Sequence, residues 1–334
     1  MTTLKGSDSA FAAAALGSYD LPGGAHARLI SLSENATFLI ETDRPIAVLR
    51  VYRSGYQQES AMRSELAWIT ALRAGGVIRT PGVLPAKDGE LLTLVQIEGE
   101  KRGCALFEFI AGEHLGDEDL ETFAQVGRTA AQLHLQVADW KPPTGFERFT
   151  WNLSSILDDG ARWGDWRHGP GHTEEGRALL EAAEAKIRGA LADYPLSPST
   201  SGLVHGDLRA ANILADSSGQ LWVIDFDDCG FSWLLWDLCS TTTFIEHLPN
   251  VDDVVSAWLR GYRDLRPLSD RDLAVIPDLV FLRRLHILAW LGSHPESDLA
   301  AELGVSYTAA TYEIARVYLD GRFLAGVDVI AGRT

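Results

Sequence analysis

The sequence predicts an α+β protein of two lobes, a small antiparallel β lobe with one helix and a larger, mainly helical lobe. Short apolar runs separated by turn residues recur between residues 28 and 110, which is the pattern of about five antiparallel strands. Within this half, segment 57–73 instead repeats its apolar residues at helical spacing, and a short helix is expected around Phe11–Leu16. After residue 120 helical spacing dominates, in 123–136, 173–194, 233–244, 252–262, 272–291 and 307–323. The 334 residues suffice for two lobes, and we expect residues 1–111 and 112–334 to form them.

Composition and charge limit the class of protein. Hydrophobic residues make up 46% of the chain and charged residues 22%, as is ordinary for a soluble globular enzyme. The net charge of -17 disfavours nucleic acid as a partner and is compatible with a cationic small molecule, although such a charge more often serves solubility. No run is long enough to span a membrane, so we expect no membrane partner. The three cysteines lack a metal-type C-x-x-C spacing, which predicts a reducing, cytoplasmic compartment.

One segment, residues 203–228, has the spacing of a phosphoryl-transfer site; its sequence is LVHGDLRAANILADSSGQLWVIDFDD. Four residues separate Asp207 from Asn212, and two apolar runs joined by a turn then lead to Asp225. We expect a hairpin that returns Asp225 beside the other two. An amide oxygen and a carboxylate are ligands that Mg²⁺ accepts alongside phosphate, and a further carboxylate can orient an attacking hydroxyl. An ordinary hairpin with surface acids is the alternative, but three such spaced residues rarely coincide with two apolar strands by chance.

The order and spacing of these residues resemble the aminoglycoside phosphotransferase and choline kinase family, whose members share the protein-kinase-like fold. The motif is His-Gly-Asp, so Gly206 replaces the arginine of protein kinases, and Asp227 replaces the glycine of their Asp-Phe-Gly. The resemblance extends from about Ser31 to Trp290 and is most specific in the segment from His205 to Asp228. It implies an ATP- and Mg²⁺-dependent transferase that phosphorylates a hydroxyl.

The resemblance also implies roles for individual residues. Asp207 would be the base that orients the acceptor hydroxyl, and Asn212 and Asp225 would hold Mg²⁺. Asp237 would brace the catalytic loop, and His205 would give structural support within that loop.

Arg50 and Glu65 are candidates for binding the ATP phosphates. Arg50 lies in a Val-Leu-Arg strand where kinases carry a lysine, and arginine keeps the charge with a different geometry. Glu65 on helix 57–73 is the expected partner of this cation, although Glu59 could serve instead. The alternative is that both Arg50 and Glu65 face solvent.

Two further parts of the small lobe resemble nucleotide-binding elements. Ser33 and Asn35 lie in the loop between the first two strands, which would cover the phosphates, although Ser-Glu-Asn also forms an ordinary hairpin turn. Residues 107–112 resemble the hinge between lobes, where backbone groups at Glu108 and Ile110 would bind adenine.

Candidates for the acceptor site come from the larger lobe and the end of the hairpin. Asp227 and Asp228 would face the acceptor and could bind an amine, and Arg209 is a further candidate. Trp163 and Trp166 belong to the irregular segment 140–172, where the family has substrate-covering insertions; they would line the pocket or, alternatively, seal the loop onto the core.

Two adjacent cations, Arg283 and Arg284, lie in an otherwise apolar helix. They would reach an acidic partner such as Asp227-Asp228, or merely flank the helix. His134 matches a frequent family position, where a core or capping role is expected.

Three functions compete. A small-molecule O-phosphotransferase acting on an antibiotic, an amino alcohol or a homoserine-like metabolite is the leading hypothesis. A bacterial Ser/Thr protein kinase of the stress-response type is the alternative, since the Asp-Asp pair and the segment 288–290 are similar, but no extended peptide-docking segment favours it. A nucleotide-binding pseudokinase is disfavoured by the intact Asp207, Asn212 and Asp225.

Overall fold

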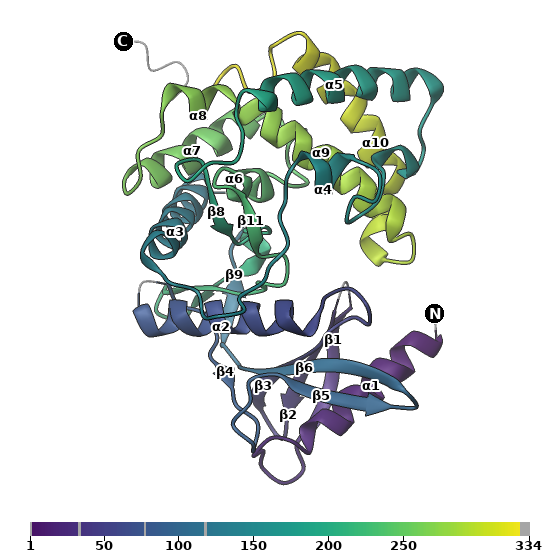
Figure 1. Ribbon diagram of the computed structural model, residues 1–334, viewed down its shortest axis with the longest axis vertical. Helices are drawn as coiled ribbons and strands as arrows, with labels where there is room; N and C mark the ends of the chain where they lie inside the picture. The colour runs from purple at the N-terminus through teal and green to yellow at the C-terminus, as the bar shows by residue number, and fades with distance from the viewer. Residues whose placement is uncertain (1, 33–34, 77, 117–118, 328–334) are drawn as a thin grey trace. The chain divides into compact units, whose positions relative to one another are not determined.

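The structure is a computed structural model that describes residues 2–32, 35–76, 78–116 and 119–327 (Figure 1). It divides into two compact units, and each takes three segments of the chain. The first consists of Met1–Glu113, Lys141–Arg148 and Leu214–Asp227; the second consists of His114–Trp140, Phe149–Ile213 and Asp228–Thr334. The first unit therefore includes the hairpin that follows Asn212.

The first unit is built on an antiparallel sheet with the order β1-β2-β3-β6-β4, to which β5 is added by pairing with β6. The strands are β1 (His26–Leu32), β2 (Ala36–Glu41), β3 (Pro45–Val51), β4 (Val83–Leu84), β5 (Thr93–Ile97) and β6 (Glu100–Glu108). Within the described residues the sheet has six strands, where five were expected. The additional strand, β4, has two residues, which are too few to produce an alternating pattern.

Two helices pack in this unit, at the two segments where helices were expected. Helix α1 (Thr2–Leu16) buries Phe11, Ala12 and Ala15 in the same core as the inner residues of the sheet, and Figure 1 shows it beside the strands. Helix α2 (Glu59–Gly75) ends at Gly76 in the left-handed conformation, with φ of 67°. The hairpin strands β9 (Ile213–Asp216) and β10 (Leu221–Val223) form a smaller sheet with β7 (Gly112–His114).

The second unit is mainly helical. Its longer helices are α3 (Leu120–Asp139), α5 (Glu174–Ala192), α7 (Val251–Arg263), α9 (Ile276–Ser293) and α10 (Asp298–Leu319). Its shorter elements are α4 (Leu153–Leu157), η1 (Trp166–His168), η2 (Ala210–Asn212), α6 (Trp236–Thr241), α8 (Asp270–Ala274) and the antiparallel pair of β8 (Ser201–Val204) and β11 (Gly230–Trp233). The expected helix 272–291 is divided into α8 and α9 because Pro277 lies in the first turn of α9, and proline is tolerated at the start of a helix but not inside it.

Close packing of helices positions the site in this unit. Helices α3 and α7 touch through backbone: a Cβ on Gly127 would lie 2.0 Å from the carbonyl oxygen of Trp258, and one on Gly261 would lie 1.8 Å from that of Ala124. Helix α9 is buried on nearly all sides, so even its two arginines lie inside the protein. In the described part of the chain, no helix combines the length and the apolarity that crossing a bilayer requires.

Candidate active site

The loop of Asp207 has a backbone that requires glycine. Gly206 has a φ of +83°, and a Cβ at this position would lie 2.4 Å from the carbonyl oxygen of Asp228. The carboxylate of Asp237, which is fully buried, accepts hydrogen bonds from the backbone N–H of His205 (3.2 Å) and of Gly206 (2.8 Å). The same carboxylate lies 2.9 Å from Nε2 of His134. This is the geometry that the predicted bracing role of Asp237 requires.

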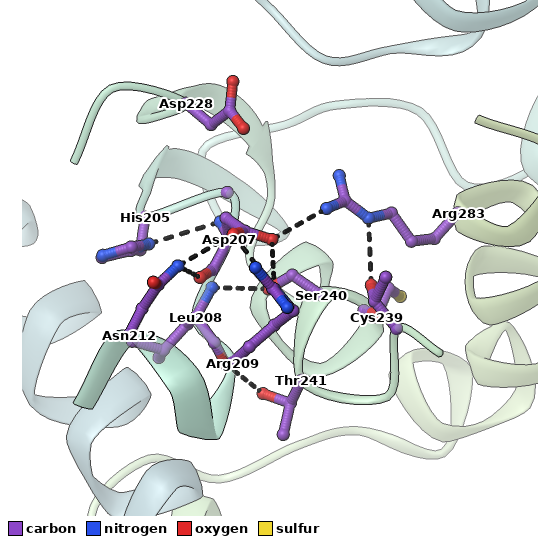
Figure 2. A network of polar contacts seen from close by, with 12 residues as sticks. His205, Asp207, Leu208, Arg209, Asn212, Asp228, Cys239, Ser240, Thr241 and Arg283 are labelled. Carbon is purple, nitrogen blue, oxygen red and sulfur yellow. Dashed lines mark hydrogen bonds and ion pairs between the residues drawn. The ribbon is translucent and has the colours of Figure 1, made fainter. Parts of the chain in front are cut away.

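Helix α6 holds the other side of this loop (Figure 2). The backbone N–H of Leu208 donates to Oγ of Ser240 (2.9 Å), and the hydroxyl of Thr241 donates to the carbonyl of Leu208 (2.8 Å). The backbone N–H and carbonyl of Leu208, the residue after Asp207, are therefore both fixed by side chains of one buried helix, which limits the freedom of the Asp207 side chain.

The carboxylate of Asp207 is bound by three side chains (Figure 2). Nε of Arg209 lies 3.1 Å from both oxygens, Nη2 of Arg283 lies 3.1 Å from Oδ1, and Nδ2 of Asn212 lies 2.8 Å from Oδ2. Burial would raise the pKa of Asp207, but the positive charges of Arg209 and Arg283 outweigh it and hold the pKa below its usual 3.8. Asp207 is therefore a carboxylate at neutral pH and can accept a hydrogen bond from a hydroxyl.

Asn212, at the end of η2, contacts this loop with its amide nitrogen. Nδ2 donates to the carbonyl oxygen of Asp207 (2.8 Å) as well as to its Oδ2. The amide oxygen of Asn212 has no hydrogen bond to any residue that the structure describes. The hydrogen-bonding pattern thus leaves a hard oxygen ligand at this position.

In the first unit, Arg50 on β3 connects a helix to the Asp-Phe-Asp turn. Its Nη1 lies 2.7 Å from Oε1 of Glu65 on α2, and its Nη2 lies 2.6 Å from Oδ1 of Asp225. The hydroxyl of Tyr52 also donates to Glu65, at 3.2 Å. Burial would lower the pKa of Arg50, but the carboxylates of Asp225 and Glu65 outweigh it and raise the pKa well above its usual value, so the side chain stays charged.

This geometry excludes the solvent-facing alternatives for Arg50 and Glu65. Arg50 is 8% exposed and Glu65 is 0% exposed. Glu59 instead pairs with Arg63 (3.1 Å) and Lys101 (3.3 Å) near the surface. Glu65 is therefore the partner of Arg50, as expected.

Asn35 and Asp227 bind each other. Nδ2 of Asn35 donates to Oδ2 of Asp227 (2.6 Å), and Oδ1 of Asn35 accepts the backbone N–H of Arg53 (3.1 Å). Gln57 donates to the carbonyl of Asp227 (3.0 Å). These contacts favour a structural role for both, and their expected roles toward phosphate and acceptor stay predictions. Ser33 lies outside the described residues.

The expected hinge residues follow the sheet. The carboxylate of Glu108, the last residue of β6, lies 2.8 Å from Arg73 and accepts the backbone N–H of Gly82 (3.2 Å). Ile110 is partly buried two residues later. The side chain of Glu108 thus ties α2 to the sheet edge, and backbone binding of adenine at these two residues stays a prediction.

The tryptophans expected at the acceptor site are buried. Trp166 is 1% exposed and its indole N–H donates to Glu184 (2.8 Å); Trp163 stacks on His286 with ring centroids 3.9 Å apart. Burial and this packing favour the alternative in which they seal the loop onto the core. Asp228 is also largely buried, and its carbonyl accepts the indole N–H of Trp151 (2.9 Å).

The two arginines of α9 have other partners than the expected Asp227-Asp228 pair. Arg283 contacts Asp207, and Arg284 lies 2.7 Å from Glu246 with neither side chain exposed. The contact of Arg283 with Asp207 was missed, although two adjacent cations in an apolar helix were a signal that buried acids exist elsewhere.

Each unit therefore holds one part of the expected motif: the second unit holds the charged Asp207 beside Asn212, and the first holds the buried Arg50–Glu65 pair bound to Asp225. Such features are typical of a phosphotransferase of the kinase type. The sequence profile of the phosphotransferase enzyme family matches residues 26–269, and the chain belongs to this family. The predicted family, the kinase-like α+β fold and the class of enzyme, a phosphotransferase with an alcohol group as acceptor, are confirmed.

Relatives of known activity are small-molecule kinases. The chain is 38% identical to a microcompartment-associated aminopropanol kinase of known structure, with a TM-score of 0.87 and coverage of 97% of this chain and 99% of that one. It is 29% identical over 268 residues to a homoserine kinase of Rhizobium etli, covering 76% of this chain and 77% of the relative. An amicoumacin kinase solved with AMP-PNP, Ca²⁺ and its ligand shares the fold, with 20% identity, a TM-score of 0.73 and coverage of 93% and 92%.

Proposed function

We propose that this protein transfers the γ-phosphate of ATP to the hydroxyl of a small amine-bearing molecule, an amino alcohol or a homoserine-like metabolite. The observation that carries the proposal is the state of Asp207, a charged carboxylate fixed on both oxygens in a loop braced by Asp237. Such a group can accept the hydrogen bond of an attacking hydroxyl and orient its oxygen toward a phosphoryl group.

Each unit offers one hard oxygen ligand and the first unit also offers a buried cation, and we propose ATP and Mg²⁺ as the nucleotide and the metal ion. Asn212 offers its amide oxygen, and among the described residues Asp225 uses only Oδ1, toward Arg50, which leaves Oδ2 as a second hard oxygen ligand. The cation would neutralise phosphate charge when it is bound. Arg50, held by Glu65, would bind the phosphates. The AMP-PNP and Ca²⁺ in the amicoumacin kinase complex support a nucleotide and a divalent cation as the class of cofactors.

The class of acceptor follows from the relatives and from charge. The aminopropanol kinase and the homoserine kinase are named for acceptors that carry both an amine and a hydroxyl. The chain has a net charge of -17, and Asp228 lies next to the Asp207 loop (Figure 2). We propose that Asp228 contributes negative charge toward the acceptor amine. Scattered cysteines, all buried and free, agree with the proposed cytoplasmic location.

A panel assay tests this function. ADP formation is measured with Mg-ATP and, in turn, 1-amino-2-propanol, ethanolamine, homoserine, choline, an aminoglycoside and a generic protein substrate, with Asp207→Asn as the inactive control. Saturable turnover with an amino alcohol or with homoserine supports the proposal. Turnover with the protein substrate alone would instead support the protein kinase alternative, and turnover with the aminoglycoside alone would move the acceptor to the antibiotic class.

A further inference from the structure

Arg283 on α9 is buried against the proposed catalytic loop. Its side chain is 2% exposed. Nη2 lies 3.1 Å from Oδ1 of Asp207 (Figure 2). Nε donates to the hydroxyl of Thr243 at 3.2 Å. The guanidinium is thus held through two of its nitrogens, and one of its two partners is the carboxylate that the proposed function places against the acceptor hydroxyl.

Two aromatic rings lie within cation–π distance of the same guanidinium. Its central carbon lies 5.4 Å from the ring centroid of Trp163 and 5.7 Å from that of Trp236. Trp163 is itself stacked on His286, with an interplanar angle of 15°. Because two of its nitrogens form hydrogen bonds and two rings lie close by, the guanidinium has little freedom to rotate.

A contribution to the stability of the fold does not explain why a charged residue is buried at position 283. Asp207 is shared between Arg283 and Arg209, so two guanidinium groups share one carboxylate. Nη1 of Arg283 has no hydrogen bond to any residue in the described part of the chain. A buried charge that is incompletely paired costs free energy, and an apolar side chain of similar volume is often neutral or stabilising. Arg284 differs, since Glu246, Thr311 and the carbonyl of Tyr307 bind it.

We propose that Arg283 is a positioning residue that fixes the orientation of the Asp207 carboxylate for phosphoryl transfer. Arg283 holds Oδ1 while Asn212 holds Oδ2, so the plane of the carboxylate is set from two different elements. Arg209 cannot replace it, because Arg209 belongs to the same loop as Asp207 and its side chain is 29% exposed. This inference rests on the proposed function, and it assigns Trp163 a supporting role behind Arg283 rather than contact with the acceptor.

The test compares Arg283→Met and Arg283→Lys with the parent, using the best acceptor of the panel. We expect Arg283→Met to lower kcat by about 10–10²-fold while both KM values stay within about threefold, because misorientation of a catalytic group by about 1 Å costs that much in rate. Arg283→Lys keeps the charge, but its ammonium lacks the planar fork, so we expect partial recovery. Arg284→Met is the matched control: it removes the neighbouring buried ion pair and should lower the melting temperature, with kcat within about threefold.

Several results would overturn the inference. The first is an unchanged kcat in folded Arg283→Met, whether or not its KM for the acceptor is raised. The second is a loss of kcat in Arg284→Met as large as that in Arg283→Met. If Arg283→Met does not fold, Thr243→Val tests the inference instead, since it keeps Arg283 and removes one of its hydrogen-bond partners. We expect a several-fold loss of kcat, and an unchanged kcat would contradict the inference. If the parent phosphorylates no compound of the panel, the proposed acceptor class fails separately. The variants are then compared by slow hydrolysis of Mg-ATP, where water takes the place of the hydroxyl and the same ordering is expected.

Discussion

Replacing Arg50 by methionine should destabilise the first unit strongly. The carboxylate of Glu65 has no solvent exposure, and its partners among the described residues are Arg50, at 2.7 Å, and the hydroxyl of Tyr52, at 3.2 Å. Without Arg50, the buried carboxylate of Glu65 keeps only the neutral hydroxyl of Tyr52 as a hydrogen-bond donor. Breaking a buried ion pair in this way costs about 3–5 kcal/mol of unfolding free energy. Because neither side chain of the pair is more than 10% exposed, solvent screening reduces this value little.

Glu65→Gln should cost less, about 1.5–3 kcal/mol, because Arg50 keeps its ion pair with Asp225 at 2.6 Å. The double variant, Arg50→Met with Glu65→Gln, has no uncompensated charge at position 65. The losses of unfolding free energy of the two single variants should therefore not add, and we expect a coupling free energy of about 0.5–3 kcal/mol. Arg63→Met is the matched control: it breaks two exposed ion pairs, an i,i+4 pair with Glu59 worth about 0.3–0.5 kcal/mol and a pair with Glu90 worth about 0.2–1 kcal/mol.

Urea unfolding followed by circular dichroism gives the unfolding free energies of the parent and the four variants, and titration with Mg-ATP gives their dissociation constants. Weaker nucleotide binding in Arg50→Met, with non-additivity in the double variant, is expected if the pair holds phosphate. Additive effects no larger than that of Arg63→Met would refute the reasoning, because the buried pair would then contribute no more than a surface pair.

Three further predictions concern the remaining site residues. Asp207→Asn should lower turnover by about 10²–10⁴-fold and keep the rise in melting temperature with Mg-ATP, because it removes a general base and no phosphate ligand; parent-like turnover would exclude Asp207 as the base. Asp225→Ala should abolish that Mg-ATP shift in a thermal melt, since the shift equals RT ln(1 + [L]/Kd) and the cation loses a ligand; an undiminished shift would contradict the metal assignment. His286→Phe should change the pH dependence of stability. Burial, followed by the nearby Arg283 and Arg162, holds the pKa of His286 well below 6.5, so only the unfolded chain binds its proton as the pH falls below 6.5. The parent should therefore lose up to about 1.4 kcal/mol of unfolding free energy per pH unit from this residue, measured by urea unfolding at pH 5–8, and identical profiles in parent and variant would exclude it.

Local spacing determined much of this protein. Asp207 and Asn212 are five residues apart in one loop, so their contact depends on a short stretch of backbone that the motif itself specifies. Arg50 and Glu65 were candidates because the family resemblance implies a strand cation and a helix glutamate at these positions, and the strand and helix periodicities agree with that placement. The turn and the two apolar runs after Asn212 likewise predicted the hairpin of β9 and β10.

Tertiary packing decided which buried charges meet. Arg283 lies 76 residues from Asp207 in sequence, Asn35 lies 192 residues from Asp227, and Arg283 and Arg284 reach different acids although they are adjacent. Periodicity predicts that a helix is buried, but it does not specify which element covers each face. The glycines of α3 and α7 show why, since their backbone contact depends on two residues whose pairing no pattern indicates. Hence the sequence and its family resemblance indicated the catalytic motif and the bracing role of Asp237, whereas Ser240 and Thr241 on α6 and Arg283 on α9 were found as partners of the Asp207 loop only from the packing of helices distant in the chain.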